Sequence, residues 1–595
     1  MVKVSEYIAN KLLSIGCKDV FMLNGGMMMH LVDTLGQKGG LQYIANFHEQ
    51  ASAMAADGYA RCSNRLGICY ATSGPGATNI ITGLAGAWQD SVPVIFITGQ
   101  SKSTDTIKYS KIKGLRQFGT FEVDIESVAR PISKYAKTIL EPKLIRYELE
   151  KAIYLCTSGR PGPVLLDIPL DIQGAIIDPD NLIGYKPKKE RIKPHKNEYK
   201  KLIKKLKESK RPLILGGIGI RRSGYIKEFI EMVEFMNIPV ATTQLGKDCI
   251  SYNHPLFVGH PGPTGDRPGN FAVQSADLII SIGSSLHSQT TGWEKELFAK
   301  NAFKVQVDVD KALLKKENIG VDLKFNLDLK DFIDELNKFE HSFNNNLWHS
   351  KCKYWKINYP ISKEPHKRQK GVINFYHFID SLSSAAPSNS CIVTDAGSAF
   401  YVLGQALKVK KNQIFISSGS MGAMGFALPA ANGAAASKSK KVTICVTGDG
   451  SLMTNIHELS TSKEYNFNIK IFVINNDGYV SMRNTQNQYF SGNQVGAGKD
   501  SGVLIPSIEK IVKSYDLPYI KIDSEFNLSK RIKDIIKSKG PQVIEVMAPS
   551  DQLIIPKVSS TKLSNGKMVS NSIENMSPLL DSIIIEKELN FINQK

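Results

Sequence analysis

Short apolar runs rich in β-branched residues alternate with helical patterns along the whole chain, which has 595 residues. Such alternation is typical of α/β domains, because two parallel strands need a crossover connection that is usually a helix. The runs fall into three groups, and we therefore predict three α/β domains, each with a doubly wound parallel sheet. The predicted strands are 43–47, 66–71, 92–98 and 164–168 in the first group, 213–215, 238–242, 278–282 and 305–309 in the second, and 391–394, 442–446 and 469–474 in the third.

Two polar stretches, 179–211 and 339–368, separate the three groups and carry few structural patterns. They place the predicted domains near 1–180, 197–340 and 369–555. The tail 556–595 has few strong patterns, and we expect it to pack over the other domains. At roughly 100–200 residues for a domain, a chain of this length accommodates three of them.

The formal net charge of +19 raises the question of a nucleic-acid partner. One segment of 26 residues, from Lys186 to Arg211, holds 13 Lys and Arg against three Glu. No recognition module accompanies it, and Pro187 and Pro194 indicate a linker that enters a helix at 197–210. We interpret this segment as a solvated connector and expect no nucleic-acid partner.

Cysteine usage and hydropathy indicate the compartment. The eight cysteines are widely spaced without a C-x-x-C pair, which argues against a zinc site or a disulfide framework and fits a reducing environment. Residues 1–21 form an amphipathic helix pattern instead of a signal peptide. The longest uncharged stretch, 412–437, is rich in Gly, Ala and Ser and contains Pro429, so it is too weakly apolar to span a membrane. We predict a cytoplasmic protein without a membrane partner.

The third group holds the strongest chemical signal. The predicted strand 442–446 runs into Gly448-Asp449-Gly450-Ser451, and 24 residues separate Gly450 from Asn475-Asn476, which end the next strand. The ends of parallel strands converge on one edge of the sheet, where glycines let the backbone approach a diphosphate. Asp449 and the Asn476 amide supply oxygen ligands suited to Mg²⁺. The alternative is an ordinary β-turn at each strand end.

This spacing of G-D-G and N-N resembles the diphosphate-binding motif of thiamine diphosphate (ThDP) enzymes. The segments NFHEQASAMAADGYAR, ATSGPGATN, DSVPVIFITGQ and GSMGAMGFALPAA resemble the acetolactate synthase branch of that family. The resemblance implies a pyrimidine-binding first domain, a Rossmann-like middle domain and a diphosphate-binding third domain. It also implies that Asp449 and Asn476 bind Mg²⁺ by side chain and Gly478 by its carbonyl, and that the active sites lie between subunits of a homodimer or homotetramer.

Glu49 is the predicted catalytic residue. It follows the predicted strand 43–47 and precedes a helical pattern at 50–61, so it lies at the carboxyl end of the strand, where ligands bind. Partial burial there would raise the pKa of its carboxyl and let it share a proton with a ring nitrogen. The resemblance implies that Glu49 hydrogen-bonds the aminopyrimidine of the cofactor and favours its imino tautomer, which removes the thiazolium C2 proton. The alternative is a helix N-terminal Glu that interacts with the helix dipole.

The resemblance places further cofactor contacts on glycine-rich turns. In the loop 419–425, the Gly422 carbonyl would accept a hydrogen bond from the aminopyrimidine and Met424 would lie beneath the ring, although a Met in an Ala/Gly run is otherwise core filler. Gly74-Pro75-Gly76 would lie near the pyrimidine of the cofactor bound by the partner, unless it is simply a turn. The remaining predicted ThDP contacts are Gly25, Asn79, Gly397, Ser398, Gly448, Gly450 and Ser451.

The middle domain begins with PLILGGIGIRRSG, whose glycines permit a tight turn from strand to helix. Arg222 replaces the third glycine of the dinucleotide-binding fingerprint, so an NAD site is poorly supported. Acetolactate synthases carry FAD in this domain, and the resemblance implies FAD contacts at Gly216, Gly217, Gly283 and Asp308. An empty or nucleotide-binding domain is the alternative.

Three departures from acetolactate synthases concern the substrate. Ser285 stands where they have an Arg that helps bind the second 2-oxo acid, Thr120-Phe121 replaces their Phe-Gln, and 484–486 replaces a Trp-containing stretch. Loss of an Arg removes a bidentate grip on a carboxylate. We take Gln117, Thr120 and Phe121 as candidate substrate contacts.

Other segments resemble the thiamine-dependent flavoenzymes of branched-sugar biosynthesis, which transfer an acetyl unit from pyruvate to a keto-sugar nucleotide. These segments are GLRQFGTFEVDI, HPGPTGDRPGNFAVQSADLIISIGS, SMRNTQNQYFSG and PKVSSTKLSNGKMVS. Ser285 departs from that group as well.

The sequence therefore predicts a ThDP- and Mg²⁺-dependent enzyme that decarboxylates pyruvate or a similar 2-oxo acid and transfers the acyl unit to a carbonyl acceptor. The acceptor is a keto-sugar nucleotide or a second 2-oxo acid. One alternative is a simple decarboxylase that releases an aldehyde. Another is a non-catalytic protein on a ThDP fold that binds an anionic partner through its basic segment, with a steep dependence on salt.

Overall fold

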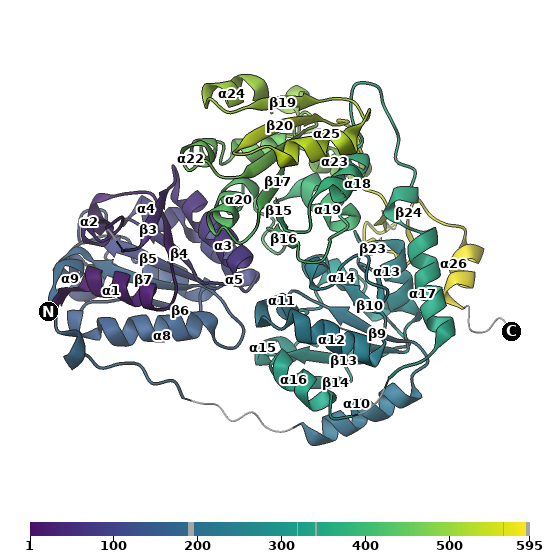
Figure 1. The fold of residues 1–595 in the computed structure, drawn as a ribbon, viewed down its shortest axis with the longest axis horizontal. Coiled ribbons are helices and arrows are strands. Elements are labelled where there is room, and N and C mark those ends of the chain that lie inside the picture. Colours follow the sequence, from purple (N-terminus) through teal and green to yellow (C-terminus); the bar gives the residue numbers. More distant parts are fainter. Residues whose placement is uncertain (38, 189–194, 318, 340–341, 563, 591–595) are drawn as a thin grey trace.

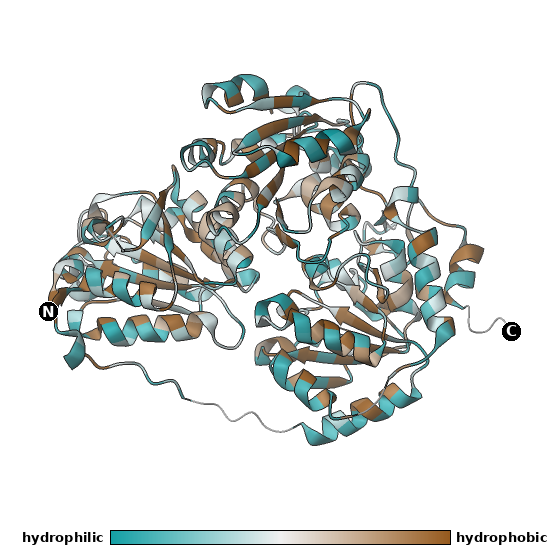
Figure 2. Ribbon diagram, in the orientation of Figure 1, coloured by the Kyte–Doolittle hydropathy of each residue, from teal (hydrophilic) through white to brown (hydrophobic). Residues whose placement is uncertain are grey.

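The computed structural model describes residues 1–595 except 38, 189–194, 318, 340–341, 563 and 591–595. Within these residues the chain forms three six-stranded sheets in which neighbouring strands are parallel, with helices packed around each sheet (Figure 1). Hydrophobic residues follow the strands, and hydrophilic residues cover the outer helices (Figure 2). The predicted α/β class with three doubly wound sheets is confirmed.

The first sheet has the strand order β3-β2-β4-β5-β7-β6. The strand predictions are confirmed for β3, β4, β5 and β7. The prediction of a helical pattern throughout 1–21 is wrong at its end, because helix α1 ends before Gly16, whose φ is +84°, and the chain then enters β2. The strands are β2 (Asp19–Met22), β3 (Gln42–Ala45), β4 (Gly67–Ala71), β5 (Val94–Gln100), β6 (Tyr135–Thr138) and β7 (Val164–Pro169), and the helices are α1 (Val4–Ser14), α2 (Met29–Asp33), α3 (Glu49–Ser63), α4 (Pro75–Asn79), α5 (Ile81–Gln89), α6 (Ile107–Ser110), α7 (Ile125–Ala129), α8 (Ile145–Thr157) and α9 (Leu170–Gly174).

The middle sheet has the order β11-β10-β9-β12-β13-β14. All four predicted strands form, and the two further strands lie at its edges. The strands are β9 (Pro212–Gly216), β10 (Val240–Thr242), β11 (Phe257–Gly259), β12 (Leu278–Ile282), β13 (Phe303–Asp308) and β14 (Leu323–Asn326), and the helices are α10 (Lys196–Glu208), α11 (Gly219–Ser223), α12 (Ile226–Met236), α13 (Arg267–Ser275), α14 (Ser288–Thr291), α15 (Lys311–Leu314) and α16 (Leu329–Leu336).

The third sheet has the order β16-β15-β17-β18-β20-β19, and its three predicted strands form. The strands are β15 (Ser390–Thr394), β16 (Ile414–Ser417), β17 (Val442–Gly448), β18 (Ile469–Asn475), β19 (Tyr519–Ile522) and β20 (Gln542–Met547), and the helices are α18 (Phe375–Ala385), α19 (Gly397–Ala406), α20 (Ala427–Ala436), α21 (Asp449–Met453), α22 (Glu458–Glu464), α23 (Val480–Tyr489), α24 (Ile508–Ser514) and α25 (Leu528–Lys537).

The two polar stretches between the groups have different structures. The basic stretch contains the predicted helix as α10, whereas its residues 189–194 lie outside the described residues. The prediction that 339–368 carries little structure is wrong, because this stretch contains α17 (Asn346–Asn358). Trp348, Cys352 and Trp355 are buried on one face of that helix and join the core of the middle sheet. This narrow apolar face lies among Asn and Lys, which obscured the helical pattern.

The tail packs over the middle sheet, as predicted. It contains short strands and one helix, β21 (Lys557–Val558), β22 (Ser560–Lys562), β23 (Met568–Ser570), β24 (Met576–Ser577) and α26 (Ser582–Leu589). Asn270 donates to the Ile573 carbonyl at 2.7 Å, and the Trp355 indole donates to the Glu588 carboxylate at 2.7 Å. These buried bonds fix the tail to the domain that it covers.

Helices α3 and α20 join the first and third sheets within one chain (Figure 1). Their glycines permit very close approach, because a Cβ on Gly58 would lie 2.1 Å from the Ala430 oxygen and one on Gly433 would lie 1.8 Å from the Ala55 oxygen. α20 lies within the uncharged stretch 412–437. Among the described residues, no helix has the length and apolar character needed to cross a membrane. The cytoplasmic location stays a prediction, and the eight cysteines are free and buried in the structure.

Candidate active site

Glycine-rich turns occupy the point in each sheet where the strand order reverses. In the first sheet these turns follow β2 and β4, in the middle sheet β9 and β12, and in the third sheet β15 and β17. The chain leaves each pair of strands in opposite directions, which opens a crevice outside their carboxyl ends, and ligands of open α/β sheets bind there. Most of the predicted cofactor residues lie on these turns.

The third-domain group contains the three predicted metal ligands. Asp449 begins α21 directly after β17, and its Oδ2 accepts hydrogen bonds from the backbone N–H groups of Asn476, at 3.1 Å, and Gly478, at 3.0 Å. Burial raises the pKa of the Asp449 carboxyl to about 6, although these backbone donors oppose the shift. The two strand ends are thus joined around a buried carboxylate, which a divalent cation would stabilise in its charged form.

Asp395 supports this group and is a residue that the sequence analysis missed. It follows β15, is fully buried, and accepts hydrogen bonds from the hydroxyls of Ser451, at 2.6 Å, and Thr447, at 2.9 Å. Burial raises the pKa of its carboxyl. Its position after a strand that neighbours β17 is the signal that identifies it, because both strands end at the same edge.

The loop 419–425 lies beside this group. Its last residue, Gly425, donates to the Ser451 hydroxyl at 2.8 Å, which ties the loop to the G-D-G-S turn. Gly422 has a φ of +65°, and Met424 is 36% exposed. A partly exposed methionine is not the core filler of the alternative interpretation. Gly397 and Ser398 begin α19 nearby, where the Ser398 hydroxyl lies 3.1 Å from that of Ser481.

The first-domain group surrounds Glu49. This residue begins α3 and is buried, and its Oε2 accepts a hydrogen bond from the Asn79 amide at 2.9 Å. Its Oε1 lies 3.3 Å from the position of a Cβ on Gly76, so the Gly74-Pro75-Gly76 turn runs directly beside the carboxylate. A Cβ on Gly25 would lie 2.5 Å from the Thr72 Cβ, so the turns after β2 and β4 approach closely because Gly25 has no side chain.

The candidate substrate contacts lie on the loop before α7. Gln117, Thr120 and Phe121 are exposed, and the Phe121 carbonyl lies 3.0 Å from the position of a Cβ on Gly74. The buried carboxylate of Glu122 holds this loop by accepting from the N–H groups of Phe118, at 2.9 Å, and Gly119, at 3.2 Å. Thr120 and Phe121 therefore lie on the rim of the Glu49 group, while no described contact joins Gln117 to it.

Within one chain, the Glu49 group and the Asp449 group are two separate groups. No hydrogen bond among the described residues joins their predicted site residues to each other. Several large apolar side chains on the segments that carry the two groups are exposed. They include Tyr43, Phe47 and Phe121 in the first domain and Met421, Met424 and Phe490 in the third.

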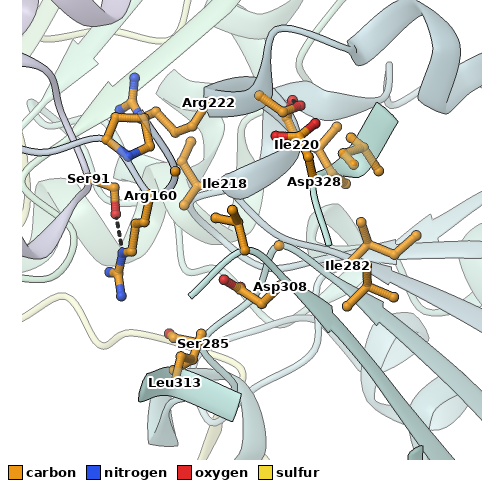
Figure 3. Close-up of a pocket in the computed structure, with 18 of the residues that line it drawn as sticks. Ser91, Arg160, Ile218, Ile220, Arg222, Ile282, Ser285, Asp308, Leu313 and Asp328 are labelled. Carbon is orange, nitrogen blue, oxygen red and sulfur yellow. Dashed lines mark hydrogen bonds between the residues drawn. The ribbon is translucent and has the colours of Figure 1, made fainter. Parts of the chain in front are cut away.

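A cavity lies between the first and middle domains (Figure 3). Two of the predicted FAD contacts, Gly283 and Asp308, line this cavity. Gly216 and Gly217 do not line it, and a Cβ on Gly217 would lie 2.2 Å from the Gly283 oxygen. Burial raises the pKa of Asp308 to about 6. A neighbouring cavity shares Gly283, Ser285 and Ser420 with it and reaches the loop 419–425. The two cavities are therefore adjacent, and we refer to them together as the groove of the middle domain.

Two arginines in this cavity have no counterpart among the predicted contacts. Arg160 donates to the Ser91 hydroxyl at 2.7 Å and pairs with Asp310 at 3.0 Å. The side chain of Arg222 makes no hydrogen bond or ion pair among the described residues, and its Nε is buried without an acceptor. Burial, followed by the nearby Arg61, lowers the pKa of Arg222 to about 10. Figure 3 shows both arginines on one side of the cavity and Asp328 on the other.

Three family models match the chain in order. They are described as the N-terminal TPP binding domain, the central domain and the C-terminal TPP binding domain of thiamine pyrophosphate enzymes, and they match residues 2–118, 199–336 and 395–546. These ranges contain most strands of the three sheets; β6 and β7 of the first sheet lie beyond residue 118, and β15 of the third sheet ends just before residue 395.

Curated relatives match over nearly the whole chain. A probable acetolactate synthase large subunit of Methanococcus aeolicus is 33% identical, with 92% of each chain covered. The acetolactate synthase large subunit of Cyanidium caldarium is 33% identical, with 93% of this chain and 94% of the relative covered. A chloroplastic acetolactate synthase of Nicotiana tabacum is 30% identical, with 94% of this chain and 84% of the relative covered.

Proposed function

Because the chain belongs to the ThDP-dependent enzymes of the acetolactate synthase family, we propose that it decarboxylates pyruvate, or a similar 2-oxo acid, and transfers the acyl unit to a carbonyl acceptor. The observation that carries this proposal is the placement of Glu49 after β3 and of Asp449 after β17, at the carboxyl edges of two sheets and next to the turns where the strand order reverses. When bound, ThDP supplies the nucleophilic carbon and the electron sink that decarboxylation needs.

The third-domain group fits a magnesium diphosphate. Asp449 and the Asn476 side chain would bind Mg²⁺ together with the Gly478 carbonyl, and Mg²⁺ commonly binds through one or two carboxylates plus phosphate oxygens. The exposed Met424 and the open space at Gly422 leave room for an aromatic ring next to the loop. Gly448, Gly450 and Ser451 would let the backbone approach the phosphates.

Glu49 would hold and exchange a proton with a ring nitrogen of the cofactor. The Asn79 amide fixes one of its oxygens, and the other lies beside the Gly76 turn. Burial of this carboxylate excludes water from the proton exchange. The role of Glu49 in this account is general acid–base chemistry at a fixed position.

The active site in this proposal is completed by a second copy of the chain. The Glu49 group of one subunit would face the Asp449 group of its partner, which explains why the two groups stay apart within one chain. The exposed apolar side chains near both groups support a protein–protein contact at these positions, because burial of Phe47, 57% exposed, and Phe490, 62% exposed, would stabilise it.

The groove of the middle domain fits FAD. The glycine turns let backbone approach a dinucleotide, Asp308 and Asp328 offer acceptors for ribose hydroxyls, and the unpartnered Arg222 offers a cation for a diphosphate. The neighbouring cavity would hold the flavin end of FAD near Ser420 and the loop 419–425. FAD is thus the cofactor that we propose for this domain, with no redox role in the overall reaction.

Replacement Arg222→Met tests this assignment. We expect the affinity for FAD to fall by about tenfold or more, equivalent to about 1.4 kcal/mol, because the diphosphate loses its cation. Calorimetric titration of the flavin-free protein, together with absorbance near ~450 nm, measures the change. Lys227→Met, on an exposed lysine outside the cavity, should bind FAD like the parent. A parent protein that binds no flavin would contradict the cofactor, and equal affinities would contradict the role of Arg222.

The acceptor in this proposal is a keto-sugar nucleotide. Ser285 lines the groove and cannot grip a second carboxylate as an arginine would. Mass spectrometry of products from pyruvate alone, and from pyruvate with a 4-keto-sugar nucleotide, decides between the acceptors. We expect a branched sugar nucleotide in the second reaction and little acetolactate in the first. Acetolactate as the main product would favour a second 2-oxo acid, and free acetaldehyde would favour a simple decarboxylase.

A further inference from the structure

Glu458 is a fully buried carboxylate at the contact between the first and third domains. It begins α22, and its side chain is 0% exposed. Among the described residues no Lys or Arg pairs with it, and the His457 ring lies 3.7 Å from its Oε1. A carboxylate in such a place requires hydrogen-bond donors in place of water, since an unpaired buried charge is strongly unfavourable. The identity of those donors shows what Glu458 holds.

The donors come mainly from the turn that carries Glu49. Oε2 of Glu458 accepts from the Asn46 amide at 2.7 Å, and Oε1 accepts from the Phe47 N–H at 2.9 Å. The Thr461 hydroxyl, one turn along α22, also donates to Oε2 at 2.7 Å. Asn46 and Phe47 lie between the end of β3 and the start of α3, three and two residues before Glu49, respectively. One third-domain side chain therefore fixes both a side chain and the backbone of this turn.

Residues that surround Glu458 also contact the loop 419–425 of the third domain. Asn455, just before α22, donates to the Gly425 carbonyl at 2.9 Å, and its amide lies 3.5 Å from Oε1 of Gln50, the residue after Glu49. The Asn432 amide of α20 donates to the Glu458 carbonyl at 3.1 Å and holds the start of α22 from the other side. Glu458 is thus rigidly placed, which a residue that positions another must be.

We propose that Glu458 is a positioning residue for Glu49, which it acts through by holding the Asn46–Phe47 turn. The proposal rests on the catalytic role assigned to Glu49 above. A shift of about 1 Å in a reacting group costs about 10²-fold in rate, so loss of this anchor would slow proton exchange at Glu49 without removing any group that touches the cofactor.

Glu458→Gln tests the proposal. The amide keeps the size of the side chain but turns an N–H₂ toward the donors Asn46 and Thr461 or toward Phe47, so one anchor bond becomes a repulsion. We expect kcat to fall by about 10- to 100-fold with KM for pyruvate and the affinity for ThDP changed by less than about threefold. The exchange of the C2 proton of bound ThDP for deuterium, measured without substrate, should slow by a similar factor. If Glu458 had only a structural role, the C2 proton exchange would not slow while the affinity for ThDP stayed nearly unchanged.

A double-mutant cycle with Glu49→Gln separates positioning from an independent role. If Glu458 acts through Glu49, Glu458→Gln causes no further loss in the Glu49→Gln background. Tyr465→Phe is the matched control, because the Tyr465 hydroxyl accepts from the Ala45 N–H at 2.8 Å and so joins the same domains farther from Glu49. It should change kcat by less than about twofold.

Several results would overturn the proposal. They are an unchanged kcat in folded Glu458→Gln, equal losses in both backgrounds, or an equal loss in Tyr465→Phe. If Glu458→Gln does not fold, Asn46→Ala removes the same anchor from the other side and leaves Glu458 in place; it is then judged by the same cycle. Full activity of Glu49→Gln is a different outcome, since it contradicts the proposed function instead.

Discussion

Glu49→Gln is expected to lower the rate of CO₂ release from pyruvate by about 10²- to 10⁴-fold, the range that proton transfer by a positioned side chain contributes. Glutamine preserves the shape of the side chain and can still accept from the Asn79 amide, but it cannot exchange a proton. The affinity for ThDP should change little, because the diphosphate is held by the Asp449 group. Steady-state kinetics at saturating ThDP and Mg²⁺ measure the effect.

A second buried carboxylate of the first domain controls for simple loss of charge. Glu148 accepts a hydrogen bond from the Tyr135 hydroxyl and is buried, but it lies on α8, away from the strand ends that carry the site. Glu148→Gln should retain kcat within about threefold. An unchanged rate in Glu49→Gln, or equal losses in both variants, would remove Glu49 from the reaction.

Asp449→Ala is expected to weaken binding of Mg²⁺ with ThDP by at least roughly 100-fold, equivalent to about 2.8 kcal/mol. The substitution removes the single carboxylate of the predicted ligand set and leaves the N–H groups of Asn476 and Gly478 without their acceptor. Calorimetric titration of Mg²⁺ in the presence of ThDP measures this loss without any need for turnover.

The neighbouring Asp477 provides the matched control, because its side chain is exposed and it has a φ of +59° that Asn tolerates. Asp477→Asn should bind Mg²⁺ and ThDP within about twofold of the parent. Retention of tight Mg²⁺ binding by Asp449→Ala would show that the metal site lies elsewhere.

The central strands of each sheet can be predicted from the sequence, whereas the edge strands are harder to predict. Strands such as β12 and β18 are apolar apart from Ser281 in β12 and Lys470 and Asn475 in β18, because helices bury both faces of a parallel sheet. The edge strands β6, β11 and β14 are short or alternate with half-buried polar residues, which periodicity alone does not separate from loops. Their pairing is decided by tertiary contacts with the neighbouring strand.

Some residues of the candidate site can also be predicted from the sequence, and others cannot. Glu49, Asp449 and Asn476 are predictable because each follows a strand, and parallel strands bring their carboxyl ends to one edge. No comparable sequence pattern identifies Glu458 or Arg222. Glu458 meets Asn46 across 412 residues of sequence, and Arg222 is distinguished by the absence of a partner in a cavity between domains. Features of this kind exist only in the folded chain.

The release of CO₂ from pyruvate by the purified protein, with and without ThDP and Mg²⁺, tests the central claim most directly. We predict release that saturates with pyruvate, requires both ThDP and Mg²⁺, and is nearly abolished in Glu49→Gln. A folded protein that binds ThDP and Mg²⁺ but releases no CO₂ from pyruvate or from any other 2-oxo acid would contradict the account.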